Sequence, residues 1–242
     1  MKLICLGSSS QGNGYILQAK ESCLLIEAGI SLMEVKKTLD FDLTKVKGLI
    51  ISHMHLDHFA KIHQFLNAGI SCWIPELPKK PLMTMFLPYL YDDRIFKIED
   101  YKIKPFSVVH DVICYGFIIQ HSEMGKTVFL TDSNYSPFKF KDINHWLIEV
   151  NYDQEILDTN MLEGRLPSIV RNRVMNSHMS LQTAKELLKA NDLSQTRNIV
   201  LLHLSGGNSD EKKFKNEIEE LTGKPVTIAN KGIEVDLSLN PF

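Results

Sequence analysis

The feature that most constrains this chain is residues 53–58, His-Met-His-Leu-Asp-His, which directly follow the apolar segment GLIIS. Alternate side chains of an extended chain point the same way, so His53 and His55 can bind one metal ion. Asp57 and His58 lie where the chain turns and can reach a second ion. Imidazole and carboxylate ligands suit Zn²⁺, Mn²⁺ or Fe. Three of the nine histidines fall in these six residues, which predicts a metal site.

Three more residues of ligand type follow apolar runs later in the chain. His110 ends FSVVH, Asp132 ends TVFLTD, and His203 lies in IVLLHLS. Taken alone, each has a simpler interpretation, because a His after an apolar run is often structural and an Asp after a strand usually belongs to a turn. Beside the histidine cluster they become candidate ligands, since two metal ions need more donors than residues 53–58 supply.

Composition limits the class of protein. The net charge of −2 excludes a strongly basic coat for non-specific nucleic-acid binding, although not a local basic patch. Four scattered cysteines in largely apolar surroundings predict buried free thiols in a reducing compartment. The chain shows neither the long apolar run of a signal peptide nor that of a membrane span, so we expect a cytoplasmic protein.

Hydrophobic periodicity predicts one α/β domain spanning residues 1–242. Strands are expected at 2–6, 15–19 and 23–27 as an antiparallel meander, and at 46–52, 102–109, 114–120, 127–131, 146–150 and 199–205. Helices are expected at 32–39, 59–69, 181–191 after a Ser180 cap, and 208–221 opened by Asn208. Residues 226–229 and 232–237 are expected to close the chain as a hairpin, and 75–105 to form an irregular cap region.

The order of these motifs resembles that of the metallo-β-lactamase superfamily. Within it, the segments GSSSQGNGYIL, LLIEAGIS, ISHMHLDH, VFLTDSN, LIEVNYD, NSHMSLQTA and LLHLSGGNS are similar to the YycJ-like (WalJ-like) exonuclease family over nearly the whole chain. The chain departs from that pattern at Glu27, where an Asp is usual, at Ser177 for Gly, and at Leu181 for Asn.

The resemblance implies a four-layer αβ/βα sandwich of two mixed sheets flanked by helices, with two divalent metal ions, Zn or Mn. It implies that His53, His55 and His110 hold one ion and that Asp57, His58 and His203 hold the other. Asp132 would bridge the two ions. Asp57 and Asp132 are thereby both ligands and catalytic residues.

Two further catalytic residues are implied by related nucleases. His178 corresponds to a late His that protonates the leaving group, and Glu149 to an acid that pairs with it. The alternative is that His178 is an ordinary residue at a helix start or in a loop and Glu149 a charge at a strand end.

Substrate contacts are expected from two segments. Arg165, Arg171 and Arg173 lie in a stretch without acidic residues from 164 to 176, and could bind a phosphate backbone. A solvated basic face is the alternative. The Gly-rich loop that contains Ser9 and Asn13 lacks nucleotide-binding spacing, and it forms either the mouth of the site or a plain tight turn.

These features together predict a metal-dependent phosphodiesterase, a DNA exonuclease acting on single strands or DNA ends. One alternative is a glyoxalase II-type thioesterase, a lactonase or another small-molecule hydrolase, because fold and metals fix chemistry only loosely. Another is a non-catalytic nucleic-acid-binding protein. The sequence leaves open the metal, DNA against RNA, the polarity of digestion and the oligomeric state.

Overall fold

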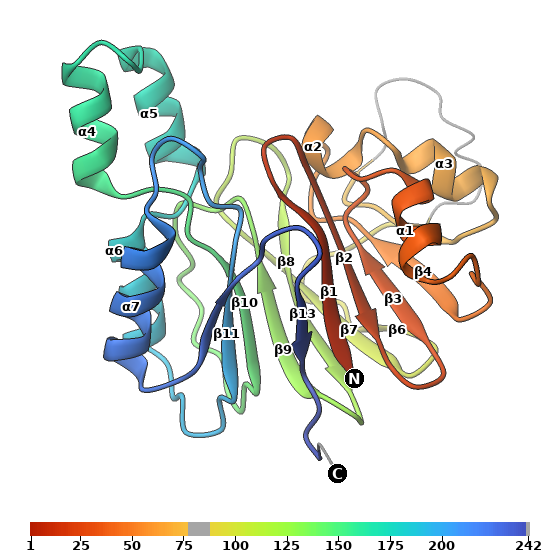
Figure 1. The fold of residues 1–242 in the computed structure, drawn as a ribbon. Helices are drawn as coiled ribbons and strands as arrows, with labels where there is room; N and C mark the ends of the chain where they lie inside the picture. Colours follow the sequence, from red (N-terminus) through yellow and green to blue (C-terminus); the bar gives the residue numbers. More distant parts are fainter. Residues whose placement is uncertain (77–87, 241–242) are drawn as a thin grey trace.

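The computed structural model describes residues 1–76 and 88–240 and shows two sheets packed face to face with helices outside (Figure 1). The six-stranded sheet has the order β13-β1-β2-β3-β4-β5 and the seven-stranded sheet β12-β11-β10-β9-β8-β7-β6. The expected four-layer sandwich of two mixed sheets is confirmed. The strands of the first sheet are β1 (Lys2–Ser9), β2 (Gly12–Gln18), β3 (Cys23–Ile26), β4 (Val46–Ile50), β5 (Cys72–Trp73) and β13 (Glu234–Asp236).

The second sheet contains β6 (Phe96–Ile98), β7 (Tyr101–Ser107), β8 (Tyr115–His121), β9 (Gly125–Leu130), β10 (His145–Glu149), β11 (Asn198–Leu202) and β12 (Val226–Ile228). The helices are α1 (Leu32–Thr38), α2 (Leu56–Phe59), α3 (Ile62–Asn67), α4 (Gln154–Leu162), α5 (Ser168–Ser177), α6 (Leu181–Lys189) and α7 (Glu211–Thr222). None of the helices in residues 1–76 and 88–240 is long and apolar enough to cross a membrane.

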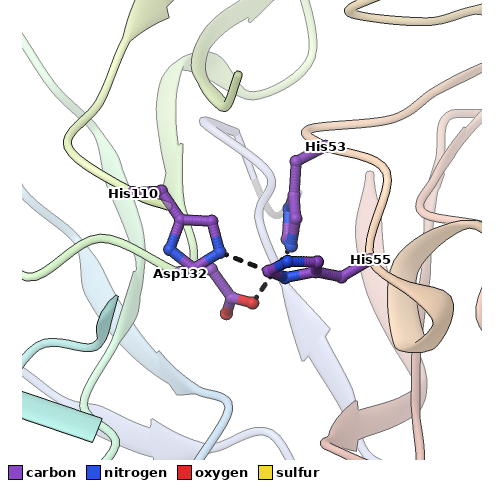
Figure 2. Close-up of side chains that lie close together, drawn as sticks. All are labelled: His53, His55, His110 and Asp132. Carbon is purple, nitrogen blue, oxygen red and sulfur yellow. Dashed lines mark hydrogen bonds and ion pairs between the residues drawn. The ribbon is translucent and has the colours of Figure 1, made fainter. Parts of the chain in front are cut away.

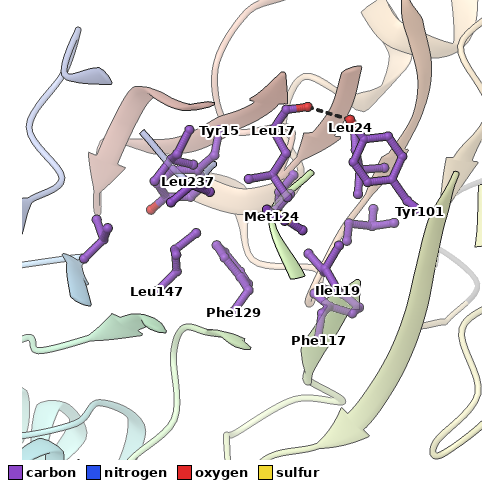
Figure 3. Close-up of a cluster of buried hydrophobic side chains, with 14 of the residues drawn as sticks. Tyr15, Leu17, Leu24, Tyr101, Phe117, Ile119, Met124, Phe129, Leu147 and Leu237 are labelled. Atoms are coloured by element: carbon purple, nitrogen blue, oxygen red, sulfur yellow. Dashed lines mark hydrogen bonds between the residues drawn. The ribbon is translucent and has the colours of Figure 1, made fainter. Parts of the chain in front are cut away.

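The inner faces of the two sheets form the central core (Figure 3). Tyr15 and Leu17 of β2 face Phe129 of β9 and Leu147 of β10, and all four are buried. Because strand side chains alternate, the opposite faces must also be covered. Residues of α6 and α7 pack on the outside of the seven-stranded sheet, and residues of α1 and α3 on the outside of the six-stranded sheet.

Strand direction gathers the polar strand ends at one edge. β3 and β4 are parallel, and so are β9, β10 and β11. Their carboxyl ends lead directly into Glu27, Ser52, Asp132, Glu149 and His203. The last strand residues before these positions are apolar, so the polar side chains emerge where the core ends.

Several predicted elements are confirmed. β1, β2 and β3 form the antiparallel meander. Ser180 caps α6, where its hydroxyl accepts a hydrogen bond from the Thr183 amide at 3.1 Å. All four cysteines are buried free thiols.

Other predictions are wrong. The terminal strands do not form a hairpin, because β12 pairs with β11 while β13 crosses to the other sheet and pairs with β1. α7 begins after Asp210, whose carboxylate accepts from the Lys213 amide, and not at Asn208. The predicted helix at 59–69 is shorter and corresponds to α3, while α2 before it, α4 and α5 were not predicted. In the expected cap region, 96–98 and 101–105 belong to strands, while 77–87 lie outside the described residues.

The turn after β3 contacts the backbone of α2 closely at Gly29. A Cβ on Gly29 would lie 1.7 Å from the carbonyl oxygen of Asp57 and 2.6 Å from the amide nitrogen of Asn13. Beside it, the Ala28 amide donates to the His58 carbonyl at 2.7 Å, and the Lys61 amide donates to the Ala28 carbonyl at 2.8 Å. Only glycine allows this approach, which fixes α2 against the end of β3.

We expect Leu147→Ala to lower the free energy of unfolding by about 2–5 kcal/mol, because it leaves a cavity between the two sheets. Leu162→Ala removes the same atoms from a side chain that is 81% exposed, and should change that free energy by less than about 0.5 kcal/mol. Urea unfolding of both variants measures the difference. Equal effects would contradict the assignment of the core.

We expect Gly29→Ala to destabilise the protein by roughly 1–3 kcal/mol or more, because backbone lies on both sides of the new methyl group. Gly206→Ala is the matched control, since a Cβ there has nothing within 4 Å. Thermal unfolding followed by circular dichroism compares the two. A Gly29→Ala protein as stable as the control would show that α2 can move away without loss.

Candidate metal centre

Seven predicted ligand residues come together from both sheets at the edge just described. His53 and His55 lie in the loop after β4, and Asp57 and His58 lie in α2. The remaining three come from the other sheet: His110 from the loop after β7, Asp132 two residues after the end of β9, and His203 immediately after β11. The site is therefore assembled across the interface between the sheets.

One group consists of His53, His55, His110 and Asp132, whose ligand atoms all lie within 4.8 Å of one another. Nδ1 of His55 is 3.2 Å from Nε2 of His110. Nε2 of His53 is 3.3 Å from Oδ2 of Asp132. Figure 2 shows the three rings and the carboxylate converging on one region. Three imidazoles and a carboxylate could hold one divalent ion.

A second group shares Asp132 and adds Asp57, His58 and His203. Nε2 of His58 is 3.1 Å from Oδ2 of Asp132 and 3.3 Å from Oδ2 of Asp57. Nε2 of His203 is 3.3 Å from the same Asp57 oxygen. The two groups correspond to the division that the sequence motifs imply.

The donor atoms of these residues fit a metal. Nε2 of His53 is buried and has no hydrogen-bond partner among the described residues, although a carboxylate is 3.3 Å away. A buried nitrogen without a partner is costly unless a ligand satisfies it. Metal-bound histidines usually present their other nitrogen to an oxygen. Here, Nδ1 of His53 is 2.9 Å from the Ser52 hydroxyl, and Nδ1 of His110 is 3.1 Å from the Ser177 carbonyl.

Glu27 presents an oxygen to the outer nitrogen of His58, as the Ser52 hydroxyl does for His53. Its Oε2 is 3.4 Å from Nδ1 of His58, and both side chains are buried. The Ser52 amide donates to the same carboxylate at 3.3 Å. The departure from the family pattern at this position therefore keeps a carboxylate beside the ring.

Electrostatics at the site oppose protonation of some rings and favour it at others. Burial, with the charge of His58 beside it, lowers the pKa of His53 to about 3, so its nitrogen is free to bind a cation. Burial would also lower the pKa of His203, but Asp132, Asp57 and Glu149 outweigh it and raise the pKa to about 10. Metal binding requires a neutral imidazole, so a divalent ion would displace that proton.

His178 and Glu149 form a pair next to the second group. Glu149 ends β10 and is completely buried, and His178 follows the last residue of α5. Nδ1 of His178 is 2.6 Å from Oε1 of Glu149. Burial would lower the pKa of His178, but the Glu149 carboxylate raises it. The Ser133 amide donates to the other oxygen of Glu149 at 3.0 Å and holds the carboxylate in place.

A cavity of about 330 Å³ opens onto these groups. Its lining includes Asp132, His178 and His203 together with Arg173. Arg173 is therefore the one of the three predicted arginines that the structure places at the site.

The other two arginines pair with acidic side chains outside the cavity lining. Arg171 binds Asp158 of α4, with Nε 2.7 Å from Oδ1, and Arg165 pairs with Glu163. Both acids precede the stretch 164–176 in the sequence. Glu163 adjoins it, and the turn between α4 and α5 brings Asp158 close to Arg171.

Asn13 and Ser9 also differ from their predicted role as substrate contacts. The Asn13 side chain is buried, and its amide nitrogen is 2.9 Å from Nε2 of His58 and 3.2 Å from Oδ2 of Asp57. The Ser9 carbonyl accepts a hydrogen bond from that amide at 3.1 Å. Asn13 thus contacts the candidate ligand atoms of His58 and Asp57 themselves, and Ser9 holds the Asn13 amide, while Ser10 lines the cavity.

Asp111 is a site residue that the sequence analysis missed. Its Oδ1 is 3.1 Å from Nε2 of His110 and 3.3 Å from Nε2 of His55, and the side chain is 53% exposed at the cavity. The sequence feature that could have indicated it is its position directly after the candidate ligand His110.

Comparisons with known proteins agree with this geometry. Residues 8–144 match the model of a protein family described as "Metallo-beta-lactamase superfamily". The exodeoxyribonuclease WalJ of Streptococcus pneumoniae is 27% identical, covering 98% of this chain and 90% of the relative. Among solved structures, the metallo-beta-lactamase fold protein YhfI of Bacillus subtilis has a TM-score of 0.74 at 17% identity, covering 97% of this chain and 99% of that one.

The short form of human tRNase Z has a TM-score of 0.62 at 15% identity, covering 99% of this chain and 100% of that one. These two structural likenesses concern the fold. The family match covers more than half of the residues, and the histidine and carboxylate groups could bind metal. These findings support a metal-dependent hydrolase. The chain belongs to the metallo-beta-lactamase superfamily.

Proposed function

We propose that this protein is a metal-dependent phosphodiesterase that digests DNA from an end. The observation that carries the proposal is the cavity itself, which is lined by the shared carboxylate Asp132, by His178 paired with Glu149, and by the cationic Arg173. A phosphodiester needs charge neutralisation on its oxygens and a proton for its leaving group. The cavity contains a residue suited to each need.

Two divalent ions, Zn²⁺ or Mn²⁺, are the proposed cofactors. His53, His55 and His110 would hold one and Asp57, His58 and His203 the other, with Asp132, which belongs to both groups, serving as a shared ligand. Such ions supply an activated water at neutral pH and neutralise the phosphoryl oxygens.

The protein's own side chains would orient the substrate and donate the proton to its leaving group. Glu149 orients the His178 ring through the hydrogen bond to Nδ1, which leaves Nε2 as the nitrogen available to a leaving oxygen. Arg173 is exposed at the mouth and can bind a phosphate oxygen of the bound strand. Glu27 holds the His58 ring from its Nδ1 side, and the Asn13 amide donates to Oδ2 of Asp57.

The relative named as an exodeoxyribonuclease supports DNA as the substrate, because its likeness extends over almost the entire chain. A thioester or a lactone, by contrast, carries no phosphate for Arg173 to bind. We therefore place acyl hydrolysis and DNA binding without cleavage among the outcomes of the tests below.

We expect Asp132→Asn to reduce DNA hydrolysis to the level of the chelator-treated protein, because one carboxylate serves both metal groups. Asn has the same shape and tolerates the left-handed backbone (φ 47°) found there, so the fold should persist, which circular dichroism of the metal-free protein checks. End-labelled single- and double-stranded DNA with Mn²⁺ or Zn²⁺ measures hydrolysis, and Asp100→Asn in an exposed turn is the control.

Full activity of Asp132→Asn would contradict the shared ligand. Wild-type protein that leaves DNA intact with every metal but cleaves thioesters or lactones would replace the proposal with acyl hydrolysis. DNA binding without cleavage of any of these substrates would indicate a binding protein.

We expect His178→Ala to lower the rate of DNA cleavage by about 10²–10⁴-fold, because the leaving oxygen loses its proton donor. A nitrophenyl phosphodiester has a leaving group that needs little protonation, so its turnover should fall much less. Bound metal, counted by mass spectrometry, should match the wild type. His63→Ala on α3 is the control, since His63 is exposed. Equal losses on both substrates would argue against proton donation.

A further inference from the structure

Lysines form a row across the outer face of the seven-stranded sheet. Lys97 of β6 pairs with Lys102 of β7, Lys102 with Gln120 of β8, and Gln120 with Lys126 of β9. Residues directly opposite on antiparallel strands point to the same face. At about 4.8 Å between strands, the row spans about 14 Å.

The alternation of side chains shows which face carries this row. Tyr101 and Ile103 belong to the core between the sheets, so Lys102 and Lys104 point outward. Core residues of α6 and α7 pack against β9, β10 and β11 on this same outer face. Lys97 and Lys102 are exposed and Lys104 is partly exposed, so the lysines lie on the part of the face beside these helices.

A groove of about 310 Å³ lies along the lysines. Besides Lys102, Lys104 and Lys126, it is lined by Lys139 and Lys141 from the connection between β9 and β10. We call these residues the basic face: Lys97, Lys102, Lys104, Lys126, Lys139 and Lys141.

Only some lysines of the basic face form ion pairs with acidic side chains among the described residues. Lys104 pairs with Asp93, and Lys126 with Asp142. Lys97 and Lys102 are directly opposed like charges, an arrangement that destabilises a sheet. A chain with a net charge of −2 nevertheless gathers six lysines here. The positive field of such a groove fits a polyanion.

Exposed aromatic side chains connect the basic face to the metal centre. β9 and β10 are parallel, so their connection runs from the metal-site edge back to the opposite edge. Along it follow Tyr135 (54% exposed) and Phe138 (41% exposed), before Lys139 and Lys141. The Phe138 ring packs edge-on against Phe106 at 5.4 Å, two residues beyond Lys104 on the same face of β7.

We propose that the basic face binds the phosphate backbone of a single DNA strand, and that Tyr135 and Phe138 contact its bases between that face and the metal centre. The inference rests on the proposed function for its substrate. Lysine-lined grooves combined with exposed aromatic rings bind single strands without sequence preference, through phosphate contacts and base stacking.

The test compares two triple variants of equal charge. Lys102→Glu/Lys139→Glu/Lys141→Glu alters the basic face, and Lys20→Glu/Lys189→Glu/Lys212→Glu alters exposed lysines elsewhere. Each takes the net charge from −2 to −8, since each substitution changes it by two. Fluorescence anisotropy with a labelled, phosphorothioate-protected single strand measures affinity over a series of salt concentrations.

We expect the basic-face variant to bind the strand at least about tenfold more weakly. The slope of log affinity against log salt concentration should fall in magnitude by about 2, because each of three lost phosphate contacts accounts for roughly 0.7. The control variant should bind nearly as the wild type does. Phe138→Ala should weaken binding with an unchanged salt slope, because stacking releases no counterions. Equal weakening by both triple variants would overturn the proposal, since net charge alone would then explain it.

Turnover of a small nitrophenyl phosphodiester separates this inference from the proposed function. The basic-face variant should show a lower ratio of DNA digestion to small-diester turnover than the wild type. A wild type that hydrolyses neither substrate contradicts the proposed function, while the anisotropy still tests the binding face. If the wild type digests DNA no faster than the basic-face variant does, the binding face is contradicted, while the proposed function is not.

Discussion

The structure of the site depends on one buried carboxylate. Oδ2 of Asp132 faces His53 and His58, and Oδ1 is 3.3 Å from Nδ1 of His203. A buried anion is tolerated only when opposite charge or donors surround it. The rings from both sheets therefore cannot be arranged independently, because His53, His58 and His203 each contact an oxygen of the same carboxylate. That constraint links the packing of the sheets to the chemistry at their edge.

The backbone that presents these groups is strained at matching places. Glu27, Asp132 and His203 each follow a strand of the core, and each has a positive φ, of 67°, 47° and 54° respectively. Left-handed backbone at a residue other than glycine costs of order 1–3 kcal/mol and persists only where the surroundings enforce it. Here the buried strand before each residue holds it in place, and near Glu27 the close contact of Gly29 with α2 adds to this constraint. Part of the stability of the core is thus used to turn three side chains towards one point.

The sequence predicted what is local and missed what depends on distant contacts. Residues 53–58 carry their spacing in the chain itself, so grouping them required no knowledge of the fold. The last strands were misassigned because nothing local distinguishes a hairpin from β13 crossing to β1. Arg171 appeared unpaired because its partner, Asp158, lies on another helix. Asn13 was expected at the mouth because burial is not visible in a Gly-rich loop.

Charge also explains why recognition of a strand would extend beyond the cavity. Asp57, Asp111 and Asp132 line the cavity, and Glu149 lies beside it, so these carboxylates oppose a phosphate backbone at the site. Bound cations offset that repulsion only over short range, because salt screens charges beyond about 8–10 Å. Arg173 is a single cation at the mouth. Attraction over the length of a strand must therefore come from elsewhere on the surface, and the lysines across β6–β9 lie at the opposite end of the strands that lead to the metal centre.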